Sequence, residues 1–210
     1  MMDVLTFLAS AGVVPVVVID DPAQSAALAQ ALIEGGLPTA EITLRTPAAL
    51  EAITALAAIP GLAVGAGTIV EPSQVTKALE AGATYLVSPG FSADVSRECS
   101  MLRVPLVPGV ATPTELMSAL DAGHELVKFF PAVAAGGVAM LKALAAPFPS
   151  VRFMPTGGIT LASLADYLAF PAVAAVGGTW IASRDAIAAG DFATVKANAA
   201  AARAVVEEQR

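Results

Sequence analysis

One lysine stands inside an apolar segment of the chain. Lys128 lies in the run Leu126-Val127-Lys128-Phe129-Phe130, whereas Lys77, Lys142 and Lys196 fall in stretches typical of solvated helices. Burying an ammonium is costly, and desolvation favours the neutral amine, which attacks carbonyl carbons. Lys128 is therefore a candidate nucleophile. The alternative is a lysine whose stem packs while its ammonium reaches the rim of the fold.

A carboxylate and a guanidinium share one face of another predicted strand. Side chains alternate along a strand, so Glu41, Thr43 and Arg45 are expected to point one way and Ile42 and Leu44 the other. If the apolar pair meets helices, the polar set points inward, with Arg45 about 13 Å beyond Glu41. This arrangement suggests a general base beneath an anion clamp. A structural pair between Glu41 and Arg45 is the alternative.

Two glycine-rich turns follow the last predicted strands. They read Pro155-Thr156-Gly157-Gly158-Ile159 and Val176-Gly177-Gly178-Thr179-Trp180. Glycines expose backbone N–H groups, which together with hydroxyls and helix N-termini bind phosphate. Each pair of glycines could instead form an ordinary tight turn. A similar segment, Val64–Thr68, ends an earlier strand, and Thr68 is expected to face the same region.

Other reactive residue types are scarce. His124 is the only histidine, which excludes histidine clusters and Ser–His triads, and it precedes a predicted strand. Cys99 is the only cysteine and falls in a helical stretch, where packing is its expected role. No acidic cluster has the spacing of metal ligands, so we expect no metal.

Short β-rich runs alternate with helical stretches along the whole chain. This alternation predicts an α/β fold, a (β/α)₈ TIM barrel with an additional N-terminal helix. The runner-up is an open doubly wound sheet, but no GxGxxG follows the first strand. The expected strands are 13–19, 39–44, 62–66, 85–88, 106–108, 126–130, 151–155 and 173–176, with helices at 2–11 and 194–208 framing the chain.

Recurring glycines and prolines punctuate the helices. Gly36, Gly82 and Gly123 each stand between a helical stretch and a strand, where a left-handed residue ends a helix. Pro47, Pro72 and Pro113 are expected in first helical turns, where a missing N–H costs nothing. In a barrel of this kind, reactive groups gather at the C-terminal ends of the strands, where Glu41 and Lys128 are expected.

Composition limits the function classes. The 210 residues are predicted to form one domain over 1–210, with 56% hydrophobic and only 14% charged residues, which excludes disorder. No apolar run reaches the roughly 18 residues of a membrane span. The net charge of −7 argues against nucleic acid or anionic membranes as partners. Surplus apolar area predicts self-association. A single cysteine and the absence of a signal-like N-terminus favour the cytoplasm.

Taken in order, the motifs resemble those of one enzyme family over essentially the whole chain. The chain is identified as similar to the 2-keto-3-deoxy-6-phosphogluconate (KDPG) and 4-hydroxy-2-oxoglutarate (KHG) aldolases. The motifs are VVPVVVI (13–19), EITLRT (41–46), VGAGT (64–68), SPG (88–90), VPGV (107–110), KFFPA (128–132), PTGGI (155–159) and GGTW (177–180).

The resemblance implies roles for the candidate residues. It implies that Lys128 forms a Schiff base with pyruvate, that Glu41 is the general acid/base, and that no cofactor is needed. It further implies that Arg45 and Thr68 bind the substrate carboxylate, and that the family's homotrimeric (β/α)₈ barrel is shared. The remaining implied substrate and phosphate contacts are Pro89, Thr156, Gly157, Gly158, Gly177, Gly178 and Thr179.

The reaction implied is cleavage of a 2-keto-3-deoxy-6-phosphosugar acid to pyruvate and glyceraldehyde 3-phosphate, with KHG as a second substrate. Two alternatives stay open. A phosphosugar isomerase on the same barrel would use the glycine turns and an acid/base pair without an imine. A non-catalytic barrel that mediates assembly would leave the inward Lys128, Glu41 and Arg45 unexplained.

Overall fold

The computed structural model describes residues 4–209, in which parallel strands alternate with helices. The strands are β1 (Val13–Val17), β2 (Thr39–Thr43), β3 (Ala63–Gly67), β4 (Tyr85–Val87), β5 (Leu106–Val107), β6 (Gly109–Val110), β7 (Leu126–Phe129), β8 (Arg152–Phe153) and β9 (Val176–Gly178). The helices are α1 (Val4–Ala11), α2 (Ser25–Glu34), α3 (Ala49–Ala57), α4 (Pro72–Glu80), α5 (Ala93–Met101), α6 (Pro113–Asp121), α7 (Gly137–Ala145), α8 (Leu161–Leu168), α9 (Arg184–Ala188) and α10 (Phe192–Glu208), with a 3₁₀ turn η1 at Pro22–Gln24.

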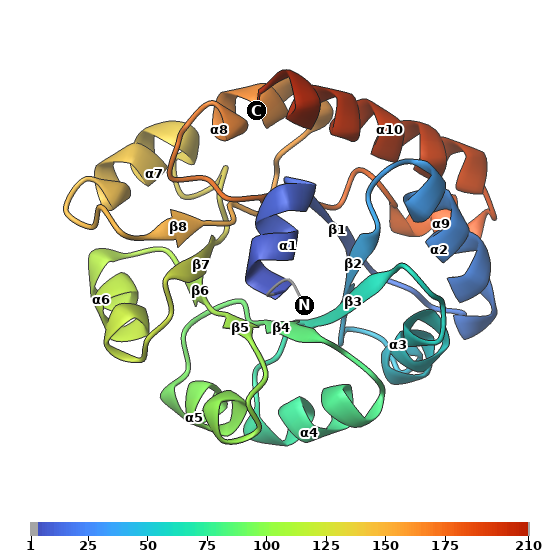
Figure 1. Ribbon diagram of the computed structural model, residues 1–210, viewed down its shortest axis with the longest axis horizontal. Helices are drawn as coiled ribbons and strands as arrows, with labels where there is room; N and C mark the ends of the chain where they lie inside the picture. Colours follow the sequence, from blue (N-terminus) through green and yellow to red (C-terminus); the bar gives the residue numbers. More distant parts are fainter. Residues whose placement is uncertain (1–3, 210) are drawn as a thin grey trace.

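The strands form one curled parallel layer. Six pair in the order β5-β4-β3-β2-β1-β9 and three in the order β6-β7-β8. Pro108 alone separates β5 from β6. Isolated parallel bridges join Phe153 to Val173 and Thr156 to Gly177, next to β8 and β9. The arrangement is TIM-barrel-like, with helices α2 to α10 around the strands (Figure 1).

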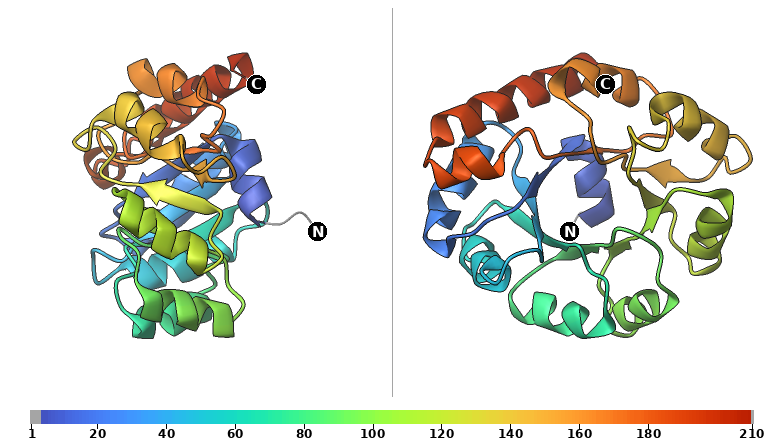
Figure 2. Two further views of the ribbon diagram at one scale, coloured as in Figure 1. Left: turned by 90° about the vertical axis from the view of Figure 1, so that its left-hand side faces the viewer. Right: turned by 180° about the vertical axis from the view of Figure 1, so that it is seen from behind.

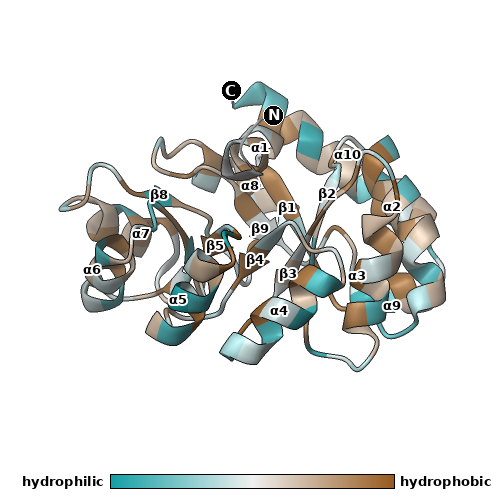
Figure 3. Ribbon diagram, turned by 60° about the horizontal axis from the view of Figure 1, so that its bottom comes forward, coloured by the Kyte–Doolittle hydropathy of each residue, from teal (hydrophilic) through white to brown (hydrophobic). Residues whose placement is uncertain are grey.

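The larger hydrophobic cluster lies between strands and helices. Val17, Ile42 and Val127 point outward from their strands into this cluster, together with helix residues such as Leu28 and Leu141. Burial of this apolar area is the main favourable term in folding. Colouring by hydropathy shows the strands largely brown while teal residues mark the helices (Figure 3). Among residues 4–209, no helix combines the length and apolar character needed to cross a bilayer.

A second, smaller cluster fills the inside of the curled sheet. Its buried members are Leu8, Val14, Tyr85, Val87, Val107, Leu126, Met154 and Ala175. Helix α1 contributes Leu8 and leads through Gly12 directly into β1, so it covers the N-terminal ends of the strands. The side view places α1 at one end of the molecule, and the rear view shows it within the outline of the ring of helices (Figure 2). Polar groups nearer the C-terminal ends of the strands therefore have this apolar cluster on one side.

Most of the predicted helix boundaries are confirmed. Pro72 and Pro113 begin α4 and α6, each behind a capping box in which the N-cap and third residues bond reciprocally. Gly36, Gly82 and Gly123 have φ of 79°, 99° and 87°, as a left-handed residue after a helix requires. The prediction for Pro47 was wrong, because α3 begins only at Ala49 after a turn.

Each predicted strand differs from the observed one at one end or both, and three of these differences bear on the site. β1 ends at Val17 and β2 at Thr43, each earlier than the apolar runs suggested, because the chain turns there toward the following helix. The final strand lies at Val176–Gly178, and Val173 forms only an isolated bridge. The sequence analysis took the glycines for a turn alone, but Val13↔Val176 and Val14↔Gly177 pair in the sheet. The predicted start at Met2 lies outside the described residues.

Candidate functional site

Lys128 and Glu41 meet inside the curled sheet. Each is the third residue of its strand, β7 and β2, and 87 residues separate them. Lys128 Nζ lies 3.2 Å from Glu41 Oε1, with side-chain exposures of 7% and 0%. The inward direction that strand alternation predicts for Glu41 is confirmed, and Lys128 is buried beside it. A buried ion pair is stable only when its atoms lie close together in good geometry and further hydrogen bonds support it. The positions of the Lys128 and Glu41 side chains are therefore strongly constrained.

Glycines of β3 make room for the inward side chains of the neighbouring strands. A β-carbon on Gly67 would overlap the Glu41 carboxylate and lie 2.7 Å from Glu41 Cγ. One on Gly65 would overlap the ring of Tyr85, which is fully buried. Glycine at these two positions thus lets Glu41 lean along the sheet and Tyr85 fill the space beside it.

Tyr85 forms the polar floor beneath the carboxylate. Its hydroxyl lies 3.0 Å from Thr39 Oγ1, which belongs to the same face of β2 as Glu41. Burial raises the pKa of Tyr85 far above its ordinary value, and the nearby charge of Glu41 adds to the increase. The phenol therefore stays neutral, and the only acid beside Lys128 in this part of the described chain is Glu41.

Two features bear on the chemistry of the pair. Glu41 Oε2 is buried and has no hydrogen-bond partner among the described residues. This oxygen is therefore available to accept a proton, or a hydrogen bond from a hydroxyl group. The ring of Phe130 lies 5.3 Å, centroid to Nζ, from Lys128, which favours a cationic nitrogen there. The site can hold a positive charge on nitrogen next to a base.

Arg45 lies just beyond the end of β2. β2 ends at Thr43, and Leu44 and Arg45 form a turn, so the period of two no longer applies. Arg45 is exposed, and its role at the site stays a prediction. Glu41 pairs with Lys128, not with Arg45. Thr43, in contrast, is buried, and its hydroxyl donates to the carbonyl of Val17.

The two predicted glycine turns lie side by side. Thr156 bridges to Gly177, and Gly177 N donates to Pro155 O at 2.9 Å. Gly157 and Gly158 have φ of 102° and 79°, conformations that side chains rarely adopt. Thr156, Gly177 and Gly178 are buried, whereas Gly158 and Thr179 are exposed. The structure thus brings both turns to one edge of the strands.

Thr68 and Pro89 follow the ends of β3 and β4 and are both half-buried. Thr68 adopts φ of 63°, an uncommon conformation for a threonine. The carbonyl of Pro89 occupies the space that a β-carbon on Gly109 would need. Both residues therefore lie on the same edge as the glycine turns, because that edge collects the C-terminal ends of parallel strands.

Several neighbours of the pair gave no signal in the sequence analysis. Phe130, Gly67 and Tyr85 each contact the pair or its support, but their residue types are common in cores and strands. Only the register between strands shows their roles. Glu41 lies opposite Gly65, and Gly65 lies opposite Tyr85, so β2, β3 and β4 together build the pocket floor.

His124 and Cys99 lie away from the pair. A cavity of about 530 Å³ at the opposite ends of the strands is lined by His124, Arg152 and Thr6 among others. His124 Nε2 lies 2.7 Å from Ser96 Oγ, and burial lowers the pKa of the imidazole. Burial also raises the pKa of the Cys99 thiol to about 11. Residues 4–209 contain no group of three or more histidine, cysteine or acidic residues that could hold a metal ion.

Comparisons with known proteins agree on one family. A family model described as KDPG and KHG aldolase matches residues 4–198. The KHG/KDPG aldolase of Escherichia coli K12 is 44% identical over 188 residues, covering 89% of this chain and 88% of that protein.

Two solved structures are similar in fold and in sequence. The KDPG aldolase of Zymomonas mobilis ZM4 with 3-phosphoglycerate has a TM-score of 0.89 at 44% identity, covering 96% of this chain and 94% of that one. The KDPG aldolase of Legionella pneumophila, with pyruvate captured as a covalent carbinolamine intermediate, has a TM-score of 0.91 at 40% identity, covering 94% and 97%.

Proposed function

The chain belongs to the KDPG and KHG aldolase family, and on that basis we propose that Lys128 and Glu41 catalyse class I aldol cleavage to pyruvate. The observation that carries the assignment is the buried contact of 3.2 Å between Lys128 Nζ and Glu41 Oε1. An amine nucleophile and a carboxylate base at hydrogen-bond distance are the minimum that imine chemistry needs. The carbinolamine trapped in the Legionella pneumophila relative is an intermediate on this route.

The first half of the reaction forms an imine on Lys128. The neutral amine attacks the C2 ketone of the 2-keto acid, and the resulting carbinolamine loses water to give a protonated imine. The positive nitrogen then lies beside the Glu41 carboxylate and the Phe130 ring, which both stabilise it. Few water molecules compete, because Lys128 and Glu41 are buried.

The second half uses Glu41 in both directions. As base, its carboxylate removes the proton of the C4 hydroxyl, and the C3–C4 bond breaks to release the aldehyde. The electron pair of that bond moves into the imine and leaves an enamine. Glu41 then returns the proton to C3, and water hydrolyses the imine to pyruvate. The buried Oε2, without a protein partner, is suited to accept that hydroxyl proton.

We assign the two ends of the substrate to residues at the C-terminal ends of the strands. We assign Arg45 and Thr68 to the keto-acid carboxylate, because Arg45 follows β2, which carries Glu41, and Thr68 follows the neighbouring strand β3. The turns at Gly157–Gly158 and Gly177–Thr179 are assigned to the phosphate, with Pro89 and Thr156 lining the site between. The positive φ of Gly157 and Gly158 supports this assignment for the first turn, because successive N–H groups in such a backbone can bind an anion.

The preferred substrate is 2-dehydro-3-deoxy-6-phosphogluconate, with 4-hydroxy-2-oxoglutarate as a second. A phosphosugar isomerase is not favoured, because the relatives are aldolases. The test is production of pyruvate from each substrate, followed by coupled reduction to lactate. Turnover of the phosphorylated acid supports the assignment. A folded protein without activity on either keto acid contradicts it.

We further propose that the strands complete a (β/α)₈ barrel, with β5 and β6 together as one strand, and that the N-terminal helix is an addition to one domain over 1–210. The surface supports self-association as a homotrimer. Met101, Met117 and Val70 are 68%, 55% and 53% exposed, which is apolar area that a subunit contact would bury. The buried, unpaired Cys99 supports a cytoplasmic setting. Measurement of mass in solution tests the trimer.

A further inference from the structure

An ion pair joins two loops that leave the same edge of the strands. Arg184 Nε donates to Asp20 Oδ2 at 2.6 Å and its Nη2 to Asp20 Oδ1 at 2.7 Å, although 164 residues separate the partners. Two parallel bonds of this kind fix the relative orientation of the partners as well as their distance. The Arg184 guanidinium also lowers the pKa of Asp20 below its ordinary value, so the carboxylate stays charged.

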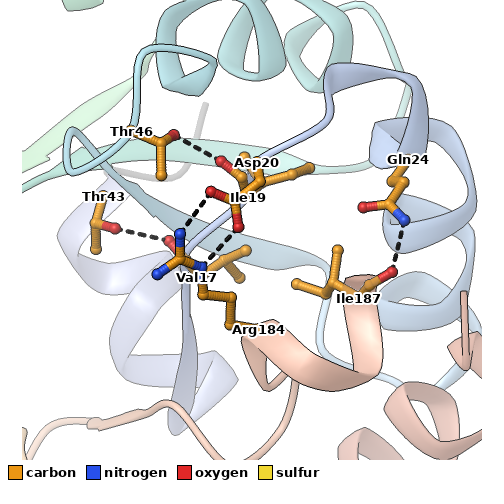
Figure 4. A network of polar contacts seen from close by, with 8 residues as sticks. All are labelled: Val17, Ile19, Asp20, Gln24, Thr43, Thr46, Arg184 and Ile187. Atoms are coloured by element: carbon orange, nitrogen blue, oxygen red, sulfur yellow. Dashed lines mark hydrogen bonds and ion pairs between the residues drawn. The ribbon is translucent and has the colours of Figure 1, made fainter. Parts of the chain in front are cut away.

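The pair ties the second glycine turn to the end of β1. Arg184 is the first residue of α9 and follows the Gly177–Thr179 turn closely in sequence, whereas Asp20 follows β1. A second bond runs the same way, from Gln24 Nε2 to the carbonyl of Ile187 at 2.6 Å. The close-up shows both contacts between the α9 segment and the loop after β1 (Figure 4).

The loop after β1 is tied in turn to the segment that carries Arg45. Thr43 Oγ1 donates to Val17 O at 2.9 Å, and Thr46 Oγ1 donates to Ile19 O at 2.6 Å. Arg45 lies between these two threonines in sequence. The loop after β1 is therefore held on one side by Arg184 of α9 and on the other by Thr43 and Thr46, the residues that flank Arg45 in sequence (Figure 4).

The ion pair between Asp20 and Arg184 contributes little to the stability of the whole protein. The side chains of Arg184 and Asp20 are 60% and 47% exposed, and ion pairs this exposed contribute little to the free energy of unfolding. Lys196 and Glu34 form a matched pair at 2.6 Å with exposures of 52% and 41%. That pair links α10 to α2 on the outer surface and touches neither the strand ends nor the glycine turns.

We propose that Asp20 and Arg184 are positioning residues that fix the separation between Arg45 and the Gly177–Thr179 turn, and that they thereby favour keto acids with a distal phosphate over shorter keto acids. The inference rests on the proposed function, in which Arg45 and that turn hold the two anionic ends of the substrate. A fixed separation selects substrates of one length, because both ends bind only when the span matches. The second anionic group of KHG lies closer to the keto group than the phosphate of the longer substrate does. The fixed separation between Arg45 and the Gly177–Thr179 turn therefore does not favour its binding.

The test compares two substrates in single and paired variants. Arg184→Gln and Asp20→Asn are assayed on the phosphorylated acid and on KHG, beside the exchanged pair Asp20→Arg with Arg184→Asp. We expect the ratio of kcat/KM for the phosphorylated acid to kcat/KM for KHG to fall about tenfold in each single variant, since small displacements cost this much. The exchanged pair should recover at least part of the ratio. Borohydride trapping of pyruvate on Lys128 should be unchanged throughout.

Control variants distinguish an effect on substrate positioning from an effect on protein stability and from an effect on the chemical step. Lys196→Gln should leave the substrate ratio within about twofold, as an exposed ion pair away from the site predicts. Arg184→Lys keeps the positive charge but cannot form the two parallel hydrogen bonds to Asp20. It replaces Arg184→Gln in the assay if that variant does not fold.

Three results would overturn the proposal: an unchanged ratio, an equal loss on both substrates, or a selective loss that the exchanged pair does not recover. If the unaltered protein traps no pyruvate, the proposed function fails as well, and that outcome is recognised before any variant is made.

Discussion

The carboxylate of Glu41 occupies the space that a β-carbon on Gly67 would need, one strand away and two residues beyond its direct cross-strand neighbour Gly65. The contact fixes where the carboxylate stands relative to Lys128 Nζ. A missing β-carbon in β3 is thus part of the catalytic geometry, although glycine has no reactive group.

Gly67→Ala should displace Glu41 and slow the reaction. The added methyl overlaps the carboxylate, and a shift of this size costs about 10²-fold in turnover when a reacting group is misplaced. Imine formation depends on Lys128, so pyruvate trapping should persist while aldol cleavage falls. Gly90→Ala is the control, because a β-carbon there meets nothing within 4 Å and φ is permissive. Equal kinetics in Gly67→Ala and the unaltered chain would show that Glu41 is not held by this contact.

Glu41→Gln should separate the base from the nucleophile. The amide keeps the shape of the side chain and an oxygen toward Lys128 but cannot exchange protons, so kcat for cleavage should fall by about 10² to 10⁴. Exchange of the pyruvate methyl protons with deuterium, followed by NMR, should slow in parallel, since enamine formation needs the same base. Glu125→Gln, an exposed neutral control, should change neither rate by more than about twofold. Fast methyl exchange in Glu41→Gln would assign the base to another group.

Cys99 should be inert in the folded protein. Burial raises the pKa of its thiol to about 11, so at pH 8 only about one molecule in a thousand carries the reactive thiolate. Iodoacetamide should leave Cys99 unmodified under native conditions and alkylate it fully in urea, as mass spectrometry would record. Modification within minutes under native conditions, or loss of activity on modification, would contradict this account of the residue.

His124 should make stability fall below neutral pH. Burial lowers the pKa of its imidazole below the ordinary 6.5, so the unfolded chain binds a proton that the folded chain resists. Above pH 6.5 the residue has no effect on the free energy of unfolding, and as pH falls through 6.5 the folded state loses stability. As the only histidine, it gives a single imidazole NMR signal, whose midpoint should lie below 6.5. A midpoint at or above 6.5 would reverse the sign.

Strand alternation was sufficient to predict the inward direction of Glu41, and the apolar segment around Lys128 indicated a lysine that could be buried. Each lies well inside a strand, so the period of two applies, and apolar neighbours such as Ile42 and Val127 face the helices. The same rule does not extend to Arg45, because β2 ends at Thr43, one residue before the predicted end at Leu44. The rule is reliable only where the backbone stays extended.

The support of the site depended on contacts that no local pattern encodes. Gly65, Gly67 and Tyr85 act through cross-strand register, which follows from how β2, β3 and β4 pair. Asp20 and Arg184 are 164 residues apart, and each alone resembles any exposed charge. The glycines of β9 were predicted as a turn, whereas their lack of side chains also allows Thr156 and Trp180 to approach the strand closely.

The central claim is that Lys128 forms a covalent imine with pyruvate. Incubation with pyruvate and borohydride, followed by peptide mass mapping, should give one reduced adduct on the peptide that contains Lys128. Lys128→Ala should abolish both that adduct and aldol cleavage, while the exposed control Lys142→Ala should retain both. A folded protein that yields no adduct, or a Lys128→Ala variant that still cleaves the keto acid, would contradict the Schiff-base mechanism.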